Sequence, residues 1–373
     1  MSERPVLVLF LGGMGGSEVE ELVGGARRAA ALDTLERALA TEAFDGAVLA
    51  TDDPSLADEV PPGVVVDVDR APFHFGARLA EIIGRYGIAR PCYLGGGSVP
   101  LLPTGAFADL AAQLAGQEAV VISNNFYSAD LVAFVPGDAV ERITPPDADN
   151  ILPRRLRDQA GLPSQPMPRT AATQFDIDTP TDLAVLSVAE GLGPRLAAYV
   201  AALGLDTARL RAAMRLFTDR EAEVLVAGRV GSQVWQYLER ETACRVRLVS
   251  EERGMEAAGR DVAGLARSLL GFYVQAAGVE RFFQSLPELG GAAFIDTRVL
   301  CAHMGETPAR EDRFWSDLGR PERVQNAFLR RFTEGALGAA VPVVLGGHSL
   351  VAGGLMALVE AAWLEHDRLQ AGT

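Results

Sequence analysis

Short apolar runs alternate with longer stretches of helical periodicity along the first half of the chain. The continuous apolar run over residues 6–11 ends in glycines, which is typical of a buried parallel strand. Similar runs predict strands over residues 47–50, 63–67, 91–95 and 119–123. Apolar residues at helical spacing predict helices over 26–43, over 76–87 and from about residue 104. This alternation indicates an α/β domain whose open, mainly parallel sheet is covered by helices on both faces.

The pattern changes after about residue 190, where helices come first and new strands follow. Apolar runs predict strands over 223–228, 245–250, 292–296 and 341–345. Helical spacing predicts helices over 193–203, 206–217, 231–242, 258–285 and 350–365. We therefore predict a second, smaller α/β domain over 191–373, after a first domain over 1–190.

Composition and charge narrow the classes of function. The 373 residues are 49% hydrophobic and carry a formal charge of −15, which argues against nucleic acid or anionic membrane as a partner. The three cysteines lie far apart without a CxxC spacing, so neither a zinc site nor a disulfide framework is indicated. The start at Met1 lacks the pattern of a signal peptide, and no apolar run reaches membrane-spanning length. We expect a cytoplasmic protein and leave open whether it forms a homo-oligomer.

Four polar or glycine-rich segments follow predicted strands or open a helix in the first domain. They are Gly12-Gly13-Met14-Gly15-Gly16, Thr51-Asp52-Asp53-Pro54, Gly97-Ser98-Val99-Pro100 and Asp176-Ile177-Asp178-Thr179-Pro180-Thr181-Asp182. Glycines allow a backbone to approach phosphate closely, whereas the acidic segments have a simpler alternative as turns and helix caps. The carboxyl ends of parallel strands share one edge, where ligands of open α/β sheets bind.

In this order, the four segments resemble the nucleotidyltransferases that include molybdenum-cofactor nucleotidylyltransferases and 2-phospholactate guanylyltransferase. The resemblance covers residues 6–186 and implies a Rossmann-like nucleotidyltransferase fold, with Mg²⁺ assisting transfer of a nucleotidyl group to a small phosphorylated acceptor. When the resemblance is carried over to this sequence, it assigns nucleotide binding to Gly12, Gly13, Gly15, Gly16, Asp52, Asp53 and Ser98. It assigns metal binding to Asp176 and Asp178.

Two positions depart from the pattern of these enzymes. The family has a basic residue just after the glycine loop, where this chain has Glu18, Glu20 and Glu21. The family also has a metal-binding aspartate where this chain has Ser98, and a hydroxyl is a poorer magnesium ligand than a carboxylate. A nucleotide-binding protein without turnover is therefore an alternative to an active transferase.

The second domain resembles no family that we recognise, but each of its strands is followed by charged or glycine-rich residues. These converge on one predicted edge and suggest a site for a small phosphorylated or carboxylate ligand. The candidate anion-binding residues are Arg229, Arg298 and Ser349. The candidate catalytic residues are Arg253, Glu251, His303 and His348. A third alternative thus assigns the chemistry to this domain alone.

Two other patterns have plainer interpretations. Arginines at 313, 320, 323, 330 and 331 alternate with acidic residues and predict a solvated, ion-paired helical face. The aromatic residues Phe272, Tyr273, Phe282 and Phe283 predict core packing or a subunit contact.

Overall fold

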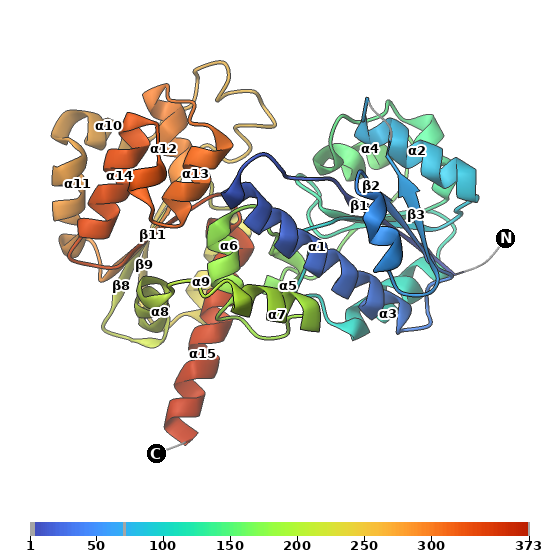
Figure 1. The fold of residues 1–373 in the computed structure, drawn as a ribbon, viewed down its shortest axis with the longest axis horizontal. Coiled ribbons are helices and arrows are strands. Elements are labelled where there is room, and N and C mark those ends of the chain that lie inside the picture. The colour runs from blue at the N-terminus through green and yellow to red at the C-terminus, as the bar shows by residue number, and fades with distance from the viewer. Residues whose placement is uncertain (1–3, 70–71, 372–373) are drawn as a thin grey trace. The chain divides into compact units, whose positions relative to one another are not determined.

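The computed structural model describes residues 4–69 and 72–371, which form two compact units (Figure 1). Unit 1 consists of Met1–Met14, Gly24–Asp176 and Gly191–Tyr199, and unit 2 consists of Gly15–Val23, Ile177–Glu190 and Val200–Thr373. Each unit is thus formed by three separate segments of the chain. The predicted boundary at residue 190, by contrast, divides the chain at a single point. Met1–Glu3, with which the sequence begins, lie outside the described residues.

The sheet of unit 1 has seven strands in the order β3-β2-β1-β4-β6-β5-β7. The strands are β1 Val6–Leu11, β2 Ala47–Thr51, β3 Val64–Val68, β4 Pro91–Gly95, β5 Val120–Ser123, β6 Leu131–Val135 and β7 Ser164–Pro166. Only β6 runs antiparallel to its neighbours β4 and β5, so the expected open, mainly parallel sheet is confirmed. Strands β6 and β7 were not among the predicted strands.

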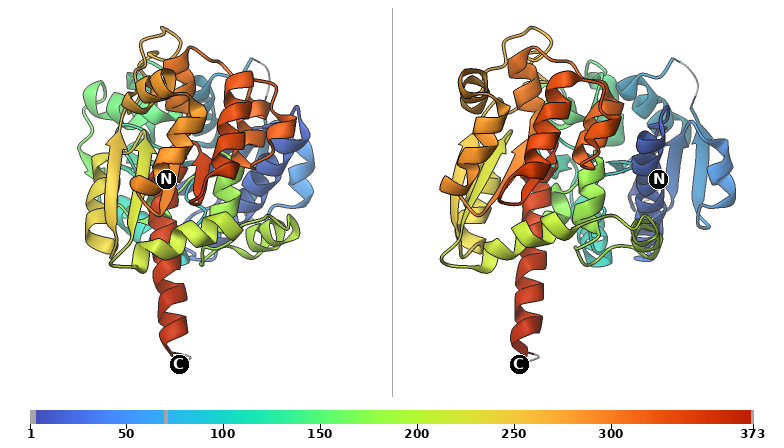
Figure 2. Two further views of the ribbon diagram at one scale, coloured as in Figure 1. Left: turned by 90° about the vertical axis from the view of Figure 1, so that its left-hand side faces the viewer. Right: turned by 60° about the vertical axis from the view of Figure 1, so that its left-hand side comes forward.

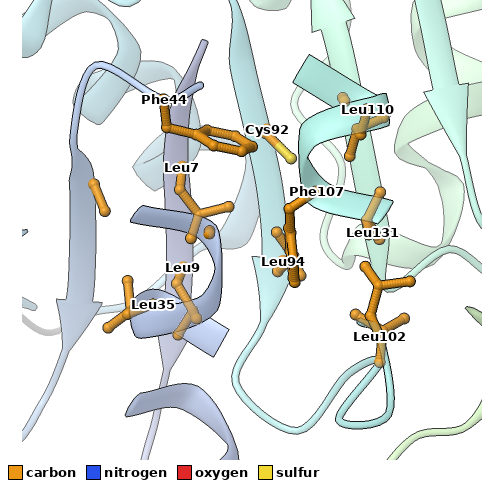
Figure 3. Packing of buried hydrophobic residues seen from close by; sticks show 14 of the residues in the cluster. Leu7, Leu9, Leu35, Phe44, Cys92, Leu94, Leu102, Phe107, Leu110 and Leu131 are labelled. Carbon is orange, nitrogen blue, oxygen red and sulfur yellow. The ribbon is translucent and has the colours of Figure 1, made fainter. Parts of the chain in front are cut away.

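Alternating side chains of β1 enter two separate cores, because successive residues of a strand point to opposite faces. Leu7 and Leu9 pack with α1 and α3 (Figure 3), whereas Val8 and Phe10 pack with α2 and α4. The helices are α1 Glu18–Leu39, α2 Phe75–Tyr86, α3 Thr104–Ala115, α4 Leu152–Asp158 and the short α5 Ala171–Gln174. Helices on both faces leave the carboxyl ends of the strands as the edge from which loops reach solvent.

The sheet of unit 2 has four parallel strands in the order β11-β10-β8-β9. They are β8 Glu223–Gly228, β9 Arg245–Ser250, β10 Ala292–Asp296 and β11 Val343–Gly346, each of which matches a predicted strand within two residues. The second α/β unit is therefore confirmed. Figure 2 shows these strands beside the helices that follow them.

The helices of unit 2 are α6 Pro180–Leu186, α8 Ala208–Arg215, α9 Ser232–Glu241, α10 Leu269–Ala277, α11 Val279–Ser285, α12 Thr297–Met304, α13 Arg310–Asp317, α14 Ala327–Gly338 and α15 Leu355–Ala371. Helices α8, α9 and α15 correspond to predicted helices, whereas α12, α13 and α14 were not among the helices that apolar spacing predicted. Helix α7 Pro194–Ala202 joins segments of the two units.

The long helix predicted over 258–285 is only partly correct, because α10 and α11 occupy its second part whereas its first part is not helical. Residues 253–264 form turns, in which Gly259 and Gly264 have positive φ angles that favour glycine. The Glu252 carboxylate binds the Arg260 guanidinium at 2.8 and 2.9 Å and also accepts the Arg267 amide, which stabilises this loop. Gly278, with φ +86°, then separates α10 from α11.

Within the described ranges, we find no helix that combines the length and the apolar character needed to span a bilayer.

Candidate functional site

The glycine loop of unit 1 presents a backbone amide to a carboxylate. The amide of Gly13, just after β1, lies 3.0 and 3.1 Å from the two carboxylate oxygens of Asp52, just after β2. A side chain at Gly12 would meet no atom within 4 Å, so the backbone there is open. The loop and Asp52 thus come together as predicted for neighbouring parallel strands, and an anionic group already lies against the loop.

Arg27 is the basic residue that reaches the glycine loop. It lies in the third turn of α1, and its Nη1 is 2.6 Å from the Sδ of Met14. The side chain is half-buried, and its Nε is shielded from solvent without a hydrogen-bond partner. No carboxylate within 4 Å of Arg27 is found in the part of the chain that the structure describes. Its charge is therefore available to an anion.

The acidic residues after the loop have partners within unit 2. Glu20 accepts hydrogen bonds from the amide and hydroxyl of Ser17 at 3.1 and 3.2 Å, and Arg310 lies 3.7 Å from it. Glu18 pairs with Arg323 at 3.3 Å. Their position at the first turn of α1 also suits the positive end of the helix dipole. They therefore have a structural role at the start of this helix.

Asp53 stabilises the turn that follows β2. Its carboxylate accepts the Ser55 amide at 2.9 Å, which caps the short helix Pro54–Asp58, and it pairs with Arg28 at 2.6 Å. The Ser55 hydrogen bonds and the Arg28 charge hold the pKa of Asp53 below its usual value. The assignment of Asp53 to nucleotide binding stays a prediction, and its local contacts are those of a cap.

Ser98 is buried at the carboxyl end of β4. Its hydroxyl donates to the carbonyl oxygens of Gly95 at 2.6 Å and of Asp130 at 3.2 Å. The next residue, Val99, has a φ angle of +46°, which is strained for a β-branched side chain. Strain of this kind concentrates at functional sites, where the surrounding structure maintains it. The Ser98 hydroxyl itself stabilises the backbone of this loop through these two hydrogen bonds.

A tyrosine–carboxylate pair that no sequence motif predicts lies beside Ser98. The Tyr93 hydroxyl donates to Asp149 at 2.8 Å, and burial followed by the Asp149 charge raises the pKa of Tyr93 well above its usual value. A side chain at Gly95 would lie near Ser98, Asp149 and Tyr93, so these groups surround one point at the strand end. Asp149 lies 56 residues from Tyr93 in the chain, so no sequence spacing indicates the pair.

The two proposed metal ligands belong to different units. Asp176 ends a segment of unit 1 and forms a β-bridge with Ser98, whereas Asp178 belongs to unit 2. Among the described residues, no three His, Cys, Asp or Glu side chains gather as metal ligands. Mg²⁺ binding by Asp176 and Asp178 therefore stays a prediction, and we route no chemistry through it.

Asp182 is a helix cap, which was the alternative considered for this segment. Its Oδ2 accepts hydrogen bonds from the Thr179 amide at 2.7 Å, the Thr179 hydroxyl at 3.0 Å and the Asp178 amide at 3.0 Å. The side chain is fully buried, and its Oδ1 has no hydrogen-bond partner among the residues described. Burial and the Asp178 charge raise the pKa of Asp182 to about 7.

In unit 2, the ends of β8 and β10 are joined by a buried ion pair. Arg229 Nε lies 2.6 Å from Asp296 Oδ2, and Arg229 Nη1 lies 2.7 Å from Glu256. Asp296 also caps α12 by accepting the Arg298 amide at 3.1 Å. Burial alone would raise the pKa of Asp296, but the charges of Arg229 and Arg298 outweigh it and keep the pKa low. Arg229, predicted to bind an anion, already has two carboxylate partners.

Arg298 likewise forms a buried ion pair, with Asp317. The two guanidinium nitrogens lie 2.7 and 2.6 Å from the two carboxylate oxygens, and Nη1 also donates to the Gly346 carbonyl at 3.0 Å. Both side chains are almost fully buried. Arg298 thereby links α12, α13 and the end of β11, and anion binding by it stays a prediction.

Arg253 and Arg313 differ from these two arginines because the structure shows no carboxylate within 4 Å of either among the described residues. Arg313 is half-buried on α13, and its Nε is shielded without a hydrogen-bond partner. Burial and the nearby Arg298 charge lower the pKa of Arg313. The solvated, ion-paired face predicted for this stretch is therefore wrong at Arg313, because α13 turns it toward Arg298.

The remaining predicted residues lie at different places in unit 2. His348 lies two residues after the end of β11, and burial and the Arg229 charge lower the pKa of its imidazole. Ser349 is buried beside it. By contrast, His303 lies in the last turn of α12, where it accepts the Ser268 amide at 2.9 Å and contacts the Phe272 ring. Glu251 accepts the Leu269 amide at 2.5 Å. Catalysis by these residues stays a prediction.

The aromatic residues divide between core and surface. Phe282 and Phe283 are buried and pack against Phe332, as expected for core residues. Phe272 and Tyr273 are 54% and 38% exposed, so only part of this set contributes to the core of unit 2.

No family model matches the sequence, and no curated protein matches it. Several solved structures resemble about half of it. A provisionally assigned nucleotide-diphospho-sugar transferase from Desulfovibrio desulfuricans G20 is 19% identical over 50% of this chain and 87% of its own, with a TM-score of 0.39. A cytidylyltransferase from Leptospira borgpetersenii is 16% identical over 54% and 93%, with a TM-score of 0.39. A 4-diphosphocytidyl-2C-methyl-D-erythritol synthase is 17% identical over 49% and 96%, with a TM-score of 0.33. Likeness at this level carries no information about ligands or activity.

Proposed function

We propose that unit 1 binds the phosphates of a nucleotide at the carboxyl ends of β1, β2 and β4. The observation that carries this proposal is Arg27, a half-buried cation that reaches Met14 of the glycine loop and has no carboxylate partner among the described residues. A buried charge without a partner costs free energy, and a bound phosphate would supply the missing partner. Arg27 would thus take the role of the basic residue that follows the glycine loop in the nucleotidyltransferases that this sequence resembles.

The loop itself supports the same conclusion. The Gly13 amide already donates to a carboxylate, and the open backbone at Gly12 leaves room for a phosphate oxygen to approach. The strained Val99 and the pair formed by buried Tyr93 and half-buried Asp149 lie at the neighbouring strand end, where a sugar or base would extend. These groups fit a neutral, hydroxyl-bearing part of a ligand better than another phosphate.

Binding without efficient nucleotidyl transfer fits these residues best. Transfer requires an acceptor phosphate oxygen to form a bond to the α-phosphorus while the bond to the departing pyrophosphate breaks. The developing charge is usually neutralised by a metal, yet Ser98 stands at the position of the expected carboxylate and donates to two carbonyl groups. We therefore infer that unit 1 binds a nucleotide with little or no turnover.

Calorimetry with ATP, GTP, CTP and UTP, each with and without Mg²⁺, tests this proposal. We expect at least one nucleotide to bind, and Arg27→Gln to weaken it about tenfold or more, because a charge-assisted hydrogen bond contributes about 1.5–3 kcal/mol. Arg154→Gln, an exposed arginine of α4 in the same unit, is the matched control and should bind normally. No binding by the wild-type protein at millimolar concentration would exclude the proposal. Pyrophosphate release with a phosphorylated acceptor would instead show that turnover survives.

A further inference from the structure

Helix α10 of unit 2 is apolar on its outer face as well as on its inner face. Its residues, LLGFYVQAA, include no charged side chain. Gly271 and Val274 are buried against the rest of the unit. By contrast, Leu269, Phe272 and Tyr273 are 69%, 54% and 38% exposed. A helix that is apolar all round is normally covered on every side, so the outer face of α10 is suited to contact another apolar surface.

The exposed residues of α10 form one continuous stripe. Its members are Leu269, Phe272, Tyr273 and Ala276, all of which are exposed. Their spacing of three, four and seven residues places them on the same side of a helix. Figure 1 shows α10 and α11 at the outer edge of unit 2, where this stripe can be approached.

The two aromatic rings of the stripe are held in place although they are exposed. The Phe272 ring lies edge-on to the His303 imidazole, with 4.6 Å between the ring centroids. The Tyr273 hydroxyl lies 2.9 Å from the hydroxyl of Ser285 on α11, and its ring lies 6.3 Å from that of Phe282. Aromatic side chains that are ordered before binding lose little conformational entropy in an interface. The stripe is thus already arranged as a contact surface.

The charge around the stripe favours a second copy of this chain as the partner. Residues 251–285 contain five acidic and four basic side chains, a net charge of −1, whereas the whole chain carries −15. Two copies therefore meet little electrostatic repulsion at this face. An anionic membrane would require an excess of basic residues, which this stretch lacks.

Two opposite charges lie at the two ends of the stripe. Arg267 and Glu280 are both exposed. The Arg267 guanidinium donates to the carbonyl oxygens of Gly264 and Ala266, and the Glu280 carboxylate accepts from Gln284. Among the residues that the structure describes, neither has an oppositely charged group within 4 Å. If two α10 helices pack antiparallel, each Arg267 approaches Glu280 of the other copy.

We propose that two copies of this chain associate through α10, with the two helices antiparallel about a twofold axis beside Phe272 and Tyr273. Leu269 of each copy then lies against Ala276 of the other, and the aromatic rings meet at the centre. A contact of this symmetry is self-complementary and closes at a dimer. The stripe is short, so we expect an interface below about 1,200 Å² and a dissociation constant roughly in the micromolar range. The association does not depend on nucleotide binding by unit 1.

Analytical ultracentrifugation of the full chain, from about 1 to 300 µM, tests this proposal. We expect the wild type to pass from monomer to dimer within this range. Phe272→Asp should weaken association about tenfold or more, because it places a charge at the apolar centre of the interface. Leu369→Asp is the matched control, because Leu369 is 64% exposed on α15 of the same unit and lies outside the stripe. It should associate like the wild type.

Charge reversal tests the antiparallel arrangement with two exposed side chains whose replacement leaves the core of unit 2 intact. Arg267→Glu and Glu280→Arg should each weaken self-association about threefold or more, because like charges then face each other across the interface. A mixture of the two variants should associate nearly as well as the wild type, since each acidic residue again faces a basic one. A merely structural role of either residue would give no such recovery.

Three results would overturn the proposal. The first is a wild-type protein that stays monomeric at the highest concentration. The second is a Phe272→Asp variant that dimerises like the wild type or is matched in its loss by Leu369→Asp. The third is a mixture of Arg267→Glu and Glu280→Arg that associates no better than either variant alone.

Discussion

Arg298 and Asp317 form a two-pronged ion pair inside unit 2, with nitrogen–oxygen distances of 2.7 and 2.6 Å. Removing one partner leaves the other charge buried without compensation. We therefore expect Asp317→Ala to lower the free energy of unfolding by about 3–5 kcal/mol. Urea unfolding of the variant measures this loss.

The matched control is the double variant Arg298→Met with Asp317→Leu. It removes both charges and keeps apolar volume, so it should be clearly more stable than Asp317→Ala alone. If both variants lose equal stability, packing at this position matters more than the ion pair.

Gly228 has a φ angle of +132° and abuts Asp296, so a methyl group there meets both backbone strain and a collision at 2.3 Å. Gly228→Ala should destabilise unit 2 by more than Gly204→Ala. Gly204 has φ +57° but open space around it, so alanine there should cost only about 1 kcal/mol of strain. Chemical unfolding of both variants compares them, and equal losses would show that the contact with Asp296 is easily relieved.

Asp182 should make stability fall as the pH rises. Its pKa is about 7 in the folded protein and near 3.8 when unfolded, so the folded state holds the proton more tightly. The stabilising effect is complete below about pH 4 and is lost as the pH passes through 7, by on the order of a few kcal/mol.

Asp182→Asn should remove this part of the pH dependence, because an amide can accept the same cap hydrogen bonds and does not ionise in this range. Unfolding free energies of variant and wild type at pH 5 and pH 8 test the difference. A variant whose stability changes with pH as much as the wild type would assign the dependence to other groups.

Asp52 places a negative charge on the loop amide that we assign to phosphate binding. Asp52→Asn removes this charge while the amide oxygen can still accept the Gly13 hydrogen. We expect a nucleoside triphosphate to bind roughly threefold to tenfold more tightly without Mg²⁺, because repulsion between the two anions is removed. Calorimetry measures the change, and weaker binding would instead indicate that Asp52 contacts the base or ribose.

The apolar runs were sufficient to predict most strands, because a strand buried on both faces must be apolar throughout. The antiparallel β6 was missed although Leu131–Val135 is equally apolar, since a short run of this kind does not reveal its partner or its direction. The first part of the helix predicted over 258–285 is not helical for a different reason. Contacts of Glu252 with Arg260 and Arg267, together with glycines at positive φ, outweigh the apolar spacing in that stretch.

In the candidate sites, too, the sequence predicts some features and leaves others undetermined. The positions of Asp52 near Gly13 and of Arg229 near the end of β10 follow from parallel strands, whose carboxyl ends share an edge. The partners themselves do not follow from the sequence. Arg27 and Arg313 both lie in stretches that the sequence predicts to be helical. Only packing shows that their charges lack carboxylates among the described residues, whereas Arg229 and Arg298 have them.

The sequence alone thus determined two α/β units with polar and glycine-rich residues at their strand ends, because burial and backbone hydrogen bonding impose periodic patterns on the chain. The tertiary structure decided which of those residues neutralise one another and which stay available to a ligand. The physical reason is that an ion pair depends on distances of a few ångströms between side chains such as Arg298 and Asp317, which come from different elements. Apolar periodicity carries no information about such distances.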